Sequence, residues 1–173
     1  MSEGARSPLR DVEAVVSSRL YWEDLPTGTG FETPARSITE ADVVGFASLT
    51  GDFNRLHVDC EFAKESFFGQ RLAHGMLVAS VSVGLATRTL VHQLIENTAV
   101  AVVENKLQFI KPTFIGDTIR VRIEVIETRH TRNPQRGITI FRRSTINQRN
   151  ETVIESTVTY LMTRRQDNPE TAS

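Results

Sequence analysis

The chain has 173 residues and a formal net charge of −1. Its fractions of hydrophobic (39%) and charged (24%) residues are ordinary. The length fits one domain with a substantial core. The balanced charge gives no electrostatic argument for binding nucleic acid or an anionic membrane. Cys60 is the single cysteine, so an internal disulfide is excluded and a reducing, cytoplasmic setting is expected.

Both ends of the chain are polar. We expect a flexible leader over residues 1–20, one folded unit over residues 21–165 and a flexible tail over residues 166–173. The leader has no apolar segment of the kind found in signal peptides. The longest apolar stretch, Met76–Leu85, is interrupted by small polar residues and is too short to cross a bilayer. A protein without a membrane partner is therefore expected.

The first half of the folded unit has the pattern of helices and loops. Thr39–Asp42 resembles a capping box, apolar residues then follow at helical spacing, and Gly51 is suited to ending that helix. A short second helix is expected to begin after Asp59 and to stop at Gly69.

A third, longer helix is expected from about His74 to Gln93, and it carries small residues on several faces. Each glycine in a helix costs about 1 kcal/mol relative to alanine. This cost is understandable if the helix is approached closely from most sides, as when a sheet wraps around it.

The second half alternates apolar and polar residues with the period of strands. Strands are expected near residues 31–37, 99–110, 119–125 and 154–162, with another beginning at 138. The class is therefore α+β, with about five antiparallel strands and one long central helix.

Asp52, Asn54 and His57 follow the first helix on an expected loop, where a scaffold commonly positions catalytic groups. A carboxylate can accept a proton from water, and histidine can hold or pass a proton near neutral pH. Asn54 can orient either partner or the water. Two other interpretations stay open here: loop side chains that satisfy backbone amides, and a metal loop that also uses Asp59.

Gly75 lies at the start of the long helix, where unpaired N–H groups and the helix dipole favour an anionic oxygen. A thioester carbonyl placed there would be stabilised as its oxygen gains charge, and such a donor is typically worth about 3 kcal/mol. The alternative is that glycine only allows the helix to begin tightly against the sheet.

Three segments together carry a family resemblance. Leu49–His57, Ala73–Leu77 and Phe109–Asp117 occur in the order found in R-specific enoyl-CoA hydratases and MaoC-like dehydratases, and the resemblance spans about Tyr21 to Met162. Proteins of that family have the hotdog fold, in which a sheet wraps around one long helix. The resemblance thus implies a hotdog domain and a homodimer, with further association left open, because this family either pairs two hotdogs or fuses two in one chain, and this chain holds one.

The resemblance also implies roles for individual residues. Asp52 and His57 become the catalytic pair that activates water, Asn54 helps to orient them, and the Gly75 N–H polarises the thioester. His74 is a packing and capping residue in the resemblance. We also expect His74 to contact the substrate, together with Arg55 and Met76. No metal and no separate cofactor are expected, because the acyl-CoA substrate carries its own coenzyme A.

Some positions depart from the family pattern or carry no expected role. Arg55 stands where the family usually has proline, so it either loosens the loop or reaches a CoA phosphate. Val83 replaces a serine that some members carry. Cys60 lacks the surroundings of a nucleophile. His92 and His130 are both expected to be exposed.

The function predicted is reversible hydration of a trans-2-enoyl-CoA to an (R)-3-hydroxyacyl-CoA, a lyase reaction of fatty acid metabolism. A hotdog acyl-CoA thioesterase is the second hypothesis. The third is a non-catalytic acyl-CoA binder or the partner subunit of a heteromeric dehydratase. The complete set of Asp52, Asn54 and His57 argues against the third, because a binder gains nothing from an acid–base pair.

Overall fold

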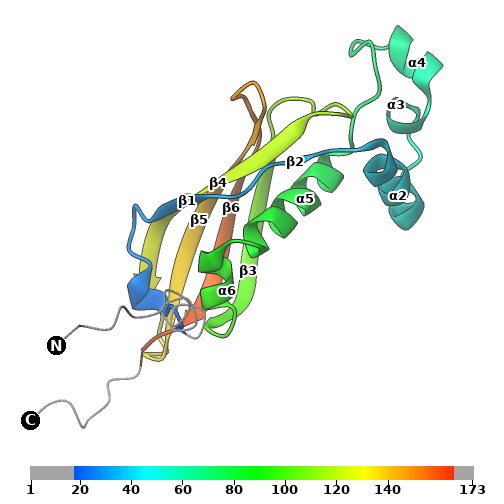
Figure 1. The fold of residues 1–173 in the computed structure, drawn as a ribbon. Helices are drawn as coiled ribbons and strands as arrows, with labels where there is room; N and C mark the ends of the chain where they lie inside the picture. Colours follow the sequence, from blue (N-terminus) through cyan, green and yellow to red (C-terminus); the bar gives the residue numbers. More distant parts are fainter. Residues whose placement is uncertain (1–17, 166–173) are drawn as a thin grey trace, which may run out of the picture.

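The protein is described by a computed structural model over residues 18–165, in which a curved antiparallel sheet lies along helix α5 (Figure 1). The strands are β1 (Gly30–Glu32), β2 (Arg36–Ser37), β3 (Ala99–Phe109), β4 (Thr118–His130), β5 (Arg136–Asn147) and β6 (Thr152–Thr163). The helices are η1 (Trp22–Asp24), α2 (Glu40–Thr50), α3 (Arg55–Val58), α4 (Cys60–Glu65), α5 (Gly75–Thr87) and α6 (Leu90–Ile95). Helices α2, α3 and α4 gather beyond one end of the sheet.

The sheet has the order β1-β4-β5-β6-β3, and β2 pairs separately with β4. The single strand expected near residues 31–37 is thus two short strands, interrupted at Pro34, which has no N–H to donate. The alternation predicted in β4 is confirmed. Its four inward residues are fully buried in the core: Ile119, Val121, Ile123 and Val125.

The predicted start and end of α2 are confirmed. The Thr39 hydroxyl accepts from the Asp42 N–H at 3.2 Å, and the Asp42 carboxylate accepts from the Thr39 N–H at 2.8 Å. Gly51 ends the helix with φ of 77°, a left-handed conformation that favours glycine. Asp59 caps α4 as expected, although that helix ends at Glu65, before Gly69.

The long helix predicted from His74 to Gln93 is wrong in its second half, because α5 and α6 are separate helices. Thr89 interrupts the helix with an extended backbone, ψ 149°. Its hydroxyl donates to the Ala86 carbonyl at 2.7 Å, and it also caps α6. Such local side-chain bonds compete with helix continuation.

Helix α5 is buried on one side only within the chain. Leu77, Val78, Leu85 and other residues of α5 pack in the core, whereas Met76 and Val83 are 52% and 42% exposed. The sequence predicts a helix covered on most sides, but within the chain α5 is covered only on the side that faces the sheet.

The predicted leader and tail fall mostly outside the described residues. Leu20, which the prediction placed in the leader, is attached to the fold, because its N–H donates to the Leu94 carbonyl at 3.1 Å. Within residues 18–165, no helix is both long and apolar enough to span a membrane.

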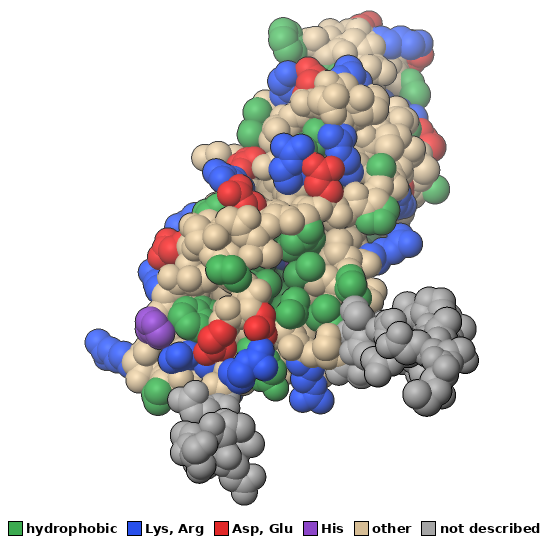
Figure 2. All heavy atoms as spheres, turned by 60° about the vertical axis from the view of Figure 1, so that its left-hand side comes forward, with side chains coloured by type: hydrophobic (Ala, Val, Ile, Leu, Met, Phe, Trp, Pro, Cys, Tyr) green, Lys and Arg blue, Asp and Glu red, His purple; other side chains and the backbone are tan. Residues whose placement is uncertain are grey.

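Charges on the outer face of the sheet are balanced locally. Arg122 lies 2.8 Å from Glu32, and Arg142 lies 2.8 Å from Glu124, each pair joining neighbouring strands. On the face drawn in Figure 2, basic and acidic side chains lie next to one another. Exposed pairs of this kind each contribute about 1 kcal/mol or less.

His92 was expected to be exposed but is buried, with 8% of its surface accessible. Its Nε2 lies 3.1 Å from Arg143 Nη2, a residue distant in sequence. Burial, reinforced by the charge of Arg143, lowers the pKa of His92 to about 4. The folded protein therefore holds a neutral imidazole near neutral pH.

The burial of His92 predicts a pH dependence of stability. The unfolded chain takes up a proton near the ordinary histidine pKa of 6.5, whereas the folded chain resists protonation down to about 4. The stabilisation is therefore complete above pH 6.5 and is lost as pH falls towards 4. Urea unfolding at about pH 7 and about pH 5 should show wild type losing about 2 kcal/mol more than His92→Gln. His130→Gln is the control, and equal losses in all three proteins would contradict the assignment.

Candidate active site

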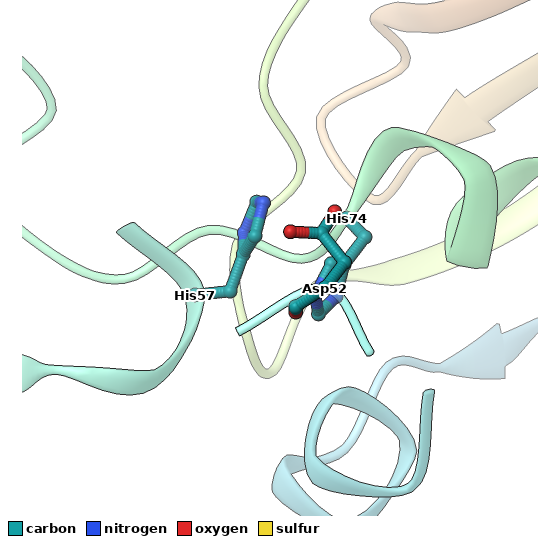
Figure 3. Close-up of side chains that lie close together, drawn as sticks. All are labelled: Asp52, His57 and His74. Carbon is teal, nitrogen blue, oxygen red and sulfur yellow. The ribbon is translucent and has the colours of Figure 1, made fainter. Parts of the chain in front are cut away.

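Asp52 stands directly after the left-handed turn at Gly51, and its exposed carboxylate points into the space beside two histidines (Figure 3). Its Oδ1 accepts the backbone N–H of Asn54 at 3.3 Å. Its backbone carbonyl lies 3.0 Å from His74 Nε2. The loop is thus held from both sides, which orients the carboxylate.

His57 lies on the four-residue helix α3, which differs from the irregular loop expected from the sequence. Its Nδ1 lies 2.9 Å from the backbone oxygen of Leu72. Because a carbonyl oxygen can only accept, Nδ1 carries the proton in this bond. In the neutral ring, Nε2 therefore presents a lone pair, as a general base requires.

His74 is buried against both members of the expected pair. Only 2% of its surface is accessible, and its ring centroid lies 3.8 Å from that of His57. Phe46 packs on it at 5.1 Å. His74 is the N-cap residue of α5, but its side chain makes no capping bond. The expected packing role is therefore met, and its polar contact is to the Asp52 carbonyl.

A cavity of about 510 Å³ joins these groups to the start of α5. Its polar lining includes Asp52, His57, His74 and Lys111. Its remaining walls are largely apolar: Phe46, Phe68, Leu72, Ala73, Gly75, Met76, Val78, Phe109, Ile110, Pro112, Thr113 and Ile154. The space has the size of a small-molecule site and the apolar character suited to an acyl chain.

Gly75 is the first residue of α5, so its N–H has no acceptor within the helix. It lines the same cavity as Asp52 and His57. A Cβ at this position would lie 2.8 Å from the ring of Phe109. Close approach of an aromatic side chain thus requires glycine here, and the helix start remains open to a ligand oxygen.

Two of the predicted residues lie outside the cavity lining. The side-chain Oδ1 of Asn54 accepts from the Leu56 N–H at 3.0 Å, so this side chain caps α3 and acts on His57 through the helix. Arg55 pairs with Asp59 at 2.9 Å and covers the ring of Phe62. Within residues 18–165, neither side chain makes a hydrogen bond or ion pair with Asp52 or His57.

The structure does not bring together the four residues of the metal loop considered from the sequence: Asp52, Asn54, His57 and Asp59. Asp59 caps α4 and pairs with Arg55, which removes it from the site. Asp52, His57 and His74 instead place ligand-capable atoms within 4.8 Å of one another. One ring nitrogen of each histidine already contacts a carbonyl. His74 Nδ1 is buried without a hydrogen-bond partner, so one histidine nitrogen of the cluster is available to a metal ion. Removal of metal therefore tests directly whether the cluster is a metal site.

Lys111 is a cavity residue that sequence reasoning did not single out. Its Nζ lies 2.7 Å from Glu151 Oε1, and half of the lysine side chain is exposed at the cavity wall. The lysine belongs to the Phe109–Asp117 segment of the family resemblance, so its position there was the available signal.

The fold and the site together define a class of protein: one hotdog unit with a carboxylate and a histidine, Asp52 and His57, in the cavity beside the start of its helix. A Mycobacterium tuberculosis protein with a double hotdog fold matches with a TM-score of 0.73 at 23% identity. The match covers 87% of this chain and 46% of that one, so the likeness concerns the fold of a single unit.

The family follows from the sequence comparison. The family model described as a MaoC like domain matches residues 24–145. The chain therefore belongs to the MaoC-like dehydratase family, which confirms the resemblance carried by its motifs.

Individual relatives cover only part of the chain. It is 43% identical over 105 residues to Protein MaoC of Klebsiella aerogenes, a match that covers 61% of this chain and 30% of that protein. It is 38% identical over 109 residues to a 3-hydroxybutyryl-CoA dehydratase of Methylorubrum extorquens, a match that covers 62% of this chain and 65% of that protein. The (R)-specific enoyl-CoA hydratase of Rhodospirillum rubrum is 35% identical over 106 residues, covering 61% and 69%. The chain thus spans less than two thirds of the first two relatives.

Solved structures extend the likeness over most of the chain. An Archaeoglobus protein described as a monoamine oxidase regulatory protein has a TM-score of 0.82 at 33% identity, covering 87% of this chain and 99% of that one. The MaoC-like dehydratase of Rhodospirillum rubrum has a TM-score of 0.77 at 28% identity, covering 86% and 99%.

Proposed function

We propose that this chain is a lyase that reversibly adds water to a trans-2-enoyl-CoA and forms an (R)-3-hydroxyacyl-CoA. One observation carries the proposal: Asp52, His57 and Gly75 line the same cavity although they come from three separate segments. Relatives named as an enoyl-CoA hydratase and a hydroxyacyl-CoA dehydratase support the reaction and its stereochemistry.

In the hydration direction, Asp52 and His57 hold one water molecule between them. The Nδ1–H of His57 donates to the Leu72 carbonyl, so Nε2 is the nitrogen that accepts a proton. The Asp52 carboxylate accepts a hydrogen bond from the same water. The water oxygen attacks the β-carbon while its proton passes to this pair, and the π electrons move to the thioester oxygen.

The Gly75 N–H stabilises the oxygen as it becomes an enolate. This donor is fixed by the helix start and gains strength as charge develops, which lowers the barrier. The enolate then returns its electrons, and the α-carbon takes the proton held by the pair. Because one pair supplies both groups from one side of the substrate, the addition is syn.

The reaction needs no metal and no cofactor beyond the coenzyme A of the substrate. Dialysis against a chelator is therefore expected to leave kcat and KM unchanged, even though Asp52, His57 and His74 lie within 4.8 Å of one another. Loss of activity that zinc restores would show that the cluster works as a metal centre.

The function is tested by hydration of crotonyl-CoA. The reaction is measured as the loss of the conjugated-thioester absorbance, and chiral analysis of the product reports its stereochemistry. A thiol reagent in a parallel reaction separates the alternatives, because a thioesterase releases free coenzyme A and a hydratase does not. Binding of enoyl-CoA thioesters without turnover at any chain length would overturn the proposal in favour of a non-catalytic binder.

A homodimer is part of the proposal. Strand β3 forms an open edge of the sheet, and its exposed residues include Val100, Val102 and Val103. The outward side of α5 also exposes Met76 and Val83. Long apolar edges of this kind are usually covered in stable proteins. Light scattering of the purified protein measures the mass directly, and a monomer would contradict this part.

A further inference from the structure

Arg143 occupies a position in the sheet where an apolar residue is expected. It lies on the same face of β5 as Phe141 and Thr145, and only 4% of its surface is accessible. The neighbouring Arg142 points to the opposite face, where it pairs with Glu124 at 2.8 Å. One of two adjacent arginines is thus turned into the interior.

The partners of Arg143 are neutral. Its Nη2 lies 3.1 Å from His92 Nε2 and 2.8 Å from the Tyr160 hydroxyl. Its Nε is buried without a hydrogen-bond partner. Among residues 18–165, no carboxylate lies within 4.0 Å of this guanidinium, which is a cation. A buried cation without an anion is costly, so a role beyond packing is indicated.

Arg143 faces a second cavity, of about 170 Å³, beside α5. Polar residues make up a larger share of its lining than in the first cavity: Ser80, Ser82, Asn105, Arg143, Thr145 and Ser156. Thr145 and Ser82 are hydrogen-bonded at 2.9 Å, so these hydroxyls are held in place.

The second cavity adjoins the first. Met76 and Ile154 line both, and Met76 directly follows Gly75. In the sheet, Phe109, Ile154 and Thr145 form one row, and Leu107, Ser156 and Arg143 form the next row on the same face. Two residues along a strand span about 7 Å, so Arg143 lies about that far beyond the Ile154 row.

We propose that Arg143 binds a carboxylate at the far end of the acyl chain, so that the preferred substrate is the CoA thioester of an unsaturated dicarboxylic acid. This inference rests on the proposed hydratase function. With the thioester oxygen at the Gly75 N–H, the chain passes Met76 and Ile154 and its terminal carboxylate reaches the guanidinium. Arginine suits this role because its planar group donates two parallel hydrogen bonds to a carboxylate.

The first test compares dicarboxylic enoyl-CoA thioesters, from fumaryl-CoA to longer homologues, with crotonyl-CoA and its longer homologues. Wild type should give its highest kcat/KM with a dicarboxylic member. Arg143→Met should lower that value by about 10²-fold and raise the value for the unsubstituted chain of matching length. Arg143→Lys should retain part of the preference. Arg142→Met, on the opposite face, is the matched control and should leave both values unchanged.

A binding measurement makes the test independent of turnover, and its wild-type comparison needs no Arg143 variant. Saturated thioesters lack the double bond and cannot react, so calorimetry with succinyl-CoA and its longer homologues against unsubstituted saturated acyl-CoAs reports recognition alone. Wild type should bind a dicarboxylic member more tightly, and Arg143→Met should lose the difference.

The outcomes separate this inference from the proposed function. If no enoyl-CoA of either series is hydrated, the proposed function fails. If unsubstituted chains are hydrated and the wild type prefers them in both turnover and binding, only the inference is overturned. If Arg143→Met changes the dimer's dissociation without changing preference, the arginine pairs with a carboxylate across the subunit interface, which also overturns it.

Discussion

Replacing Asp52 with asparagine or His57 with alanine is expected to lower the kcat/KM for crotonyl-CoA hydration by about 10²- to 10⁴-fold, the usual contribution of a positioned proton-transfer group. Asparagine keeps the shape of Asp52 but cannot accept the proton. Alanine removes the only ring nitrogen of His57 that is free to act as a base, since the other donates to the Leu72 carbonyl.

Two control variants keep this prediction specific. Asp59→Asn retains an oxygen that can cap α4, and His130→Ala removes an exposed histidine from the far end of β4. Both should keep wild-type turnover. Because Asp52 and His57 act on one water, the kcat/KM of the double variant should be only slightly below that of the less active single variant. Near-wild-type hydration by both single variants would exclude this pair from the chemistry.

Removing the Gly75 N–H is expected to lower kcat by about 10²- to 10³-fold, the effect of losing one oxyanion donor. Proline removes that N–H and is tolerated at the first position of a helix. The preceding His74 has ψ of 134°, which suits a residue before proline. Gly75→Pro therefore deletes the donor with little change to the backbone.

Gly75→Ala is the necessary comparison, because any Cβ at this position meets the Phe109 ring at 2.8 Å. Alanine brings the same contact but keeps the N–H, so the ratio of kcat between the two variants reports the donor alone. Circular dichroism and thermal unfolding of both variants check that α5 still forms. Equal activity of the alanine and proline variants would place the thioester oxygen elsewhere.

Elements with strong local signals could be predicted from the sequence. The alternation in β4 and the capping box at Thr39–Asp42 each depend on residues close together in the chain, and both are confirmed. Helix α3 is only four residues long, too short for a periodic pattern to show. The break at Thr89 was missed because a local hydroxyl contact outweighed the helical pattern around it.

The site was predictable in its residue types but less so in its contacts. Asp52, His57 and Gly75 were found from their motifs, and they line one cavity. The contact between His74 and the Asp52 carbonyl joins residues 22 positions apart, which no local pattern reveals. Burial of His92 likewise depends on Arg143, 51 positions away.

Two hydrogen bonds, one nested inside the other along the chain, hold the two ends of the site segment together: His57 bonds the Leu72 carbonyl, and His74 bonds the Asp52 carbonyl. Between these fastened ends the chain makes an excursion through α4, over residues 58–71, and Phe68 from this excursion forms part of the cavity wall. Insertions or deletions within it would reshape the wall at Phe68 while leaving Asp52 and His57 held by the same hydrogen bonds. The excursion is therefore the segment in which substrate range can diversify, or be engineered, without rebuilding the chemistry.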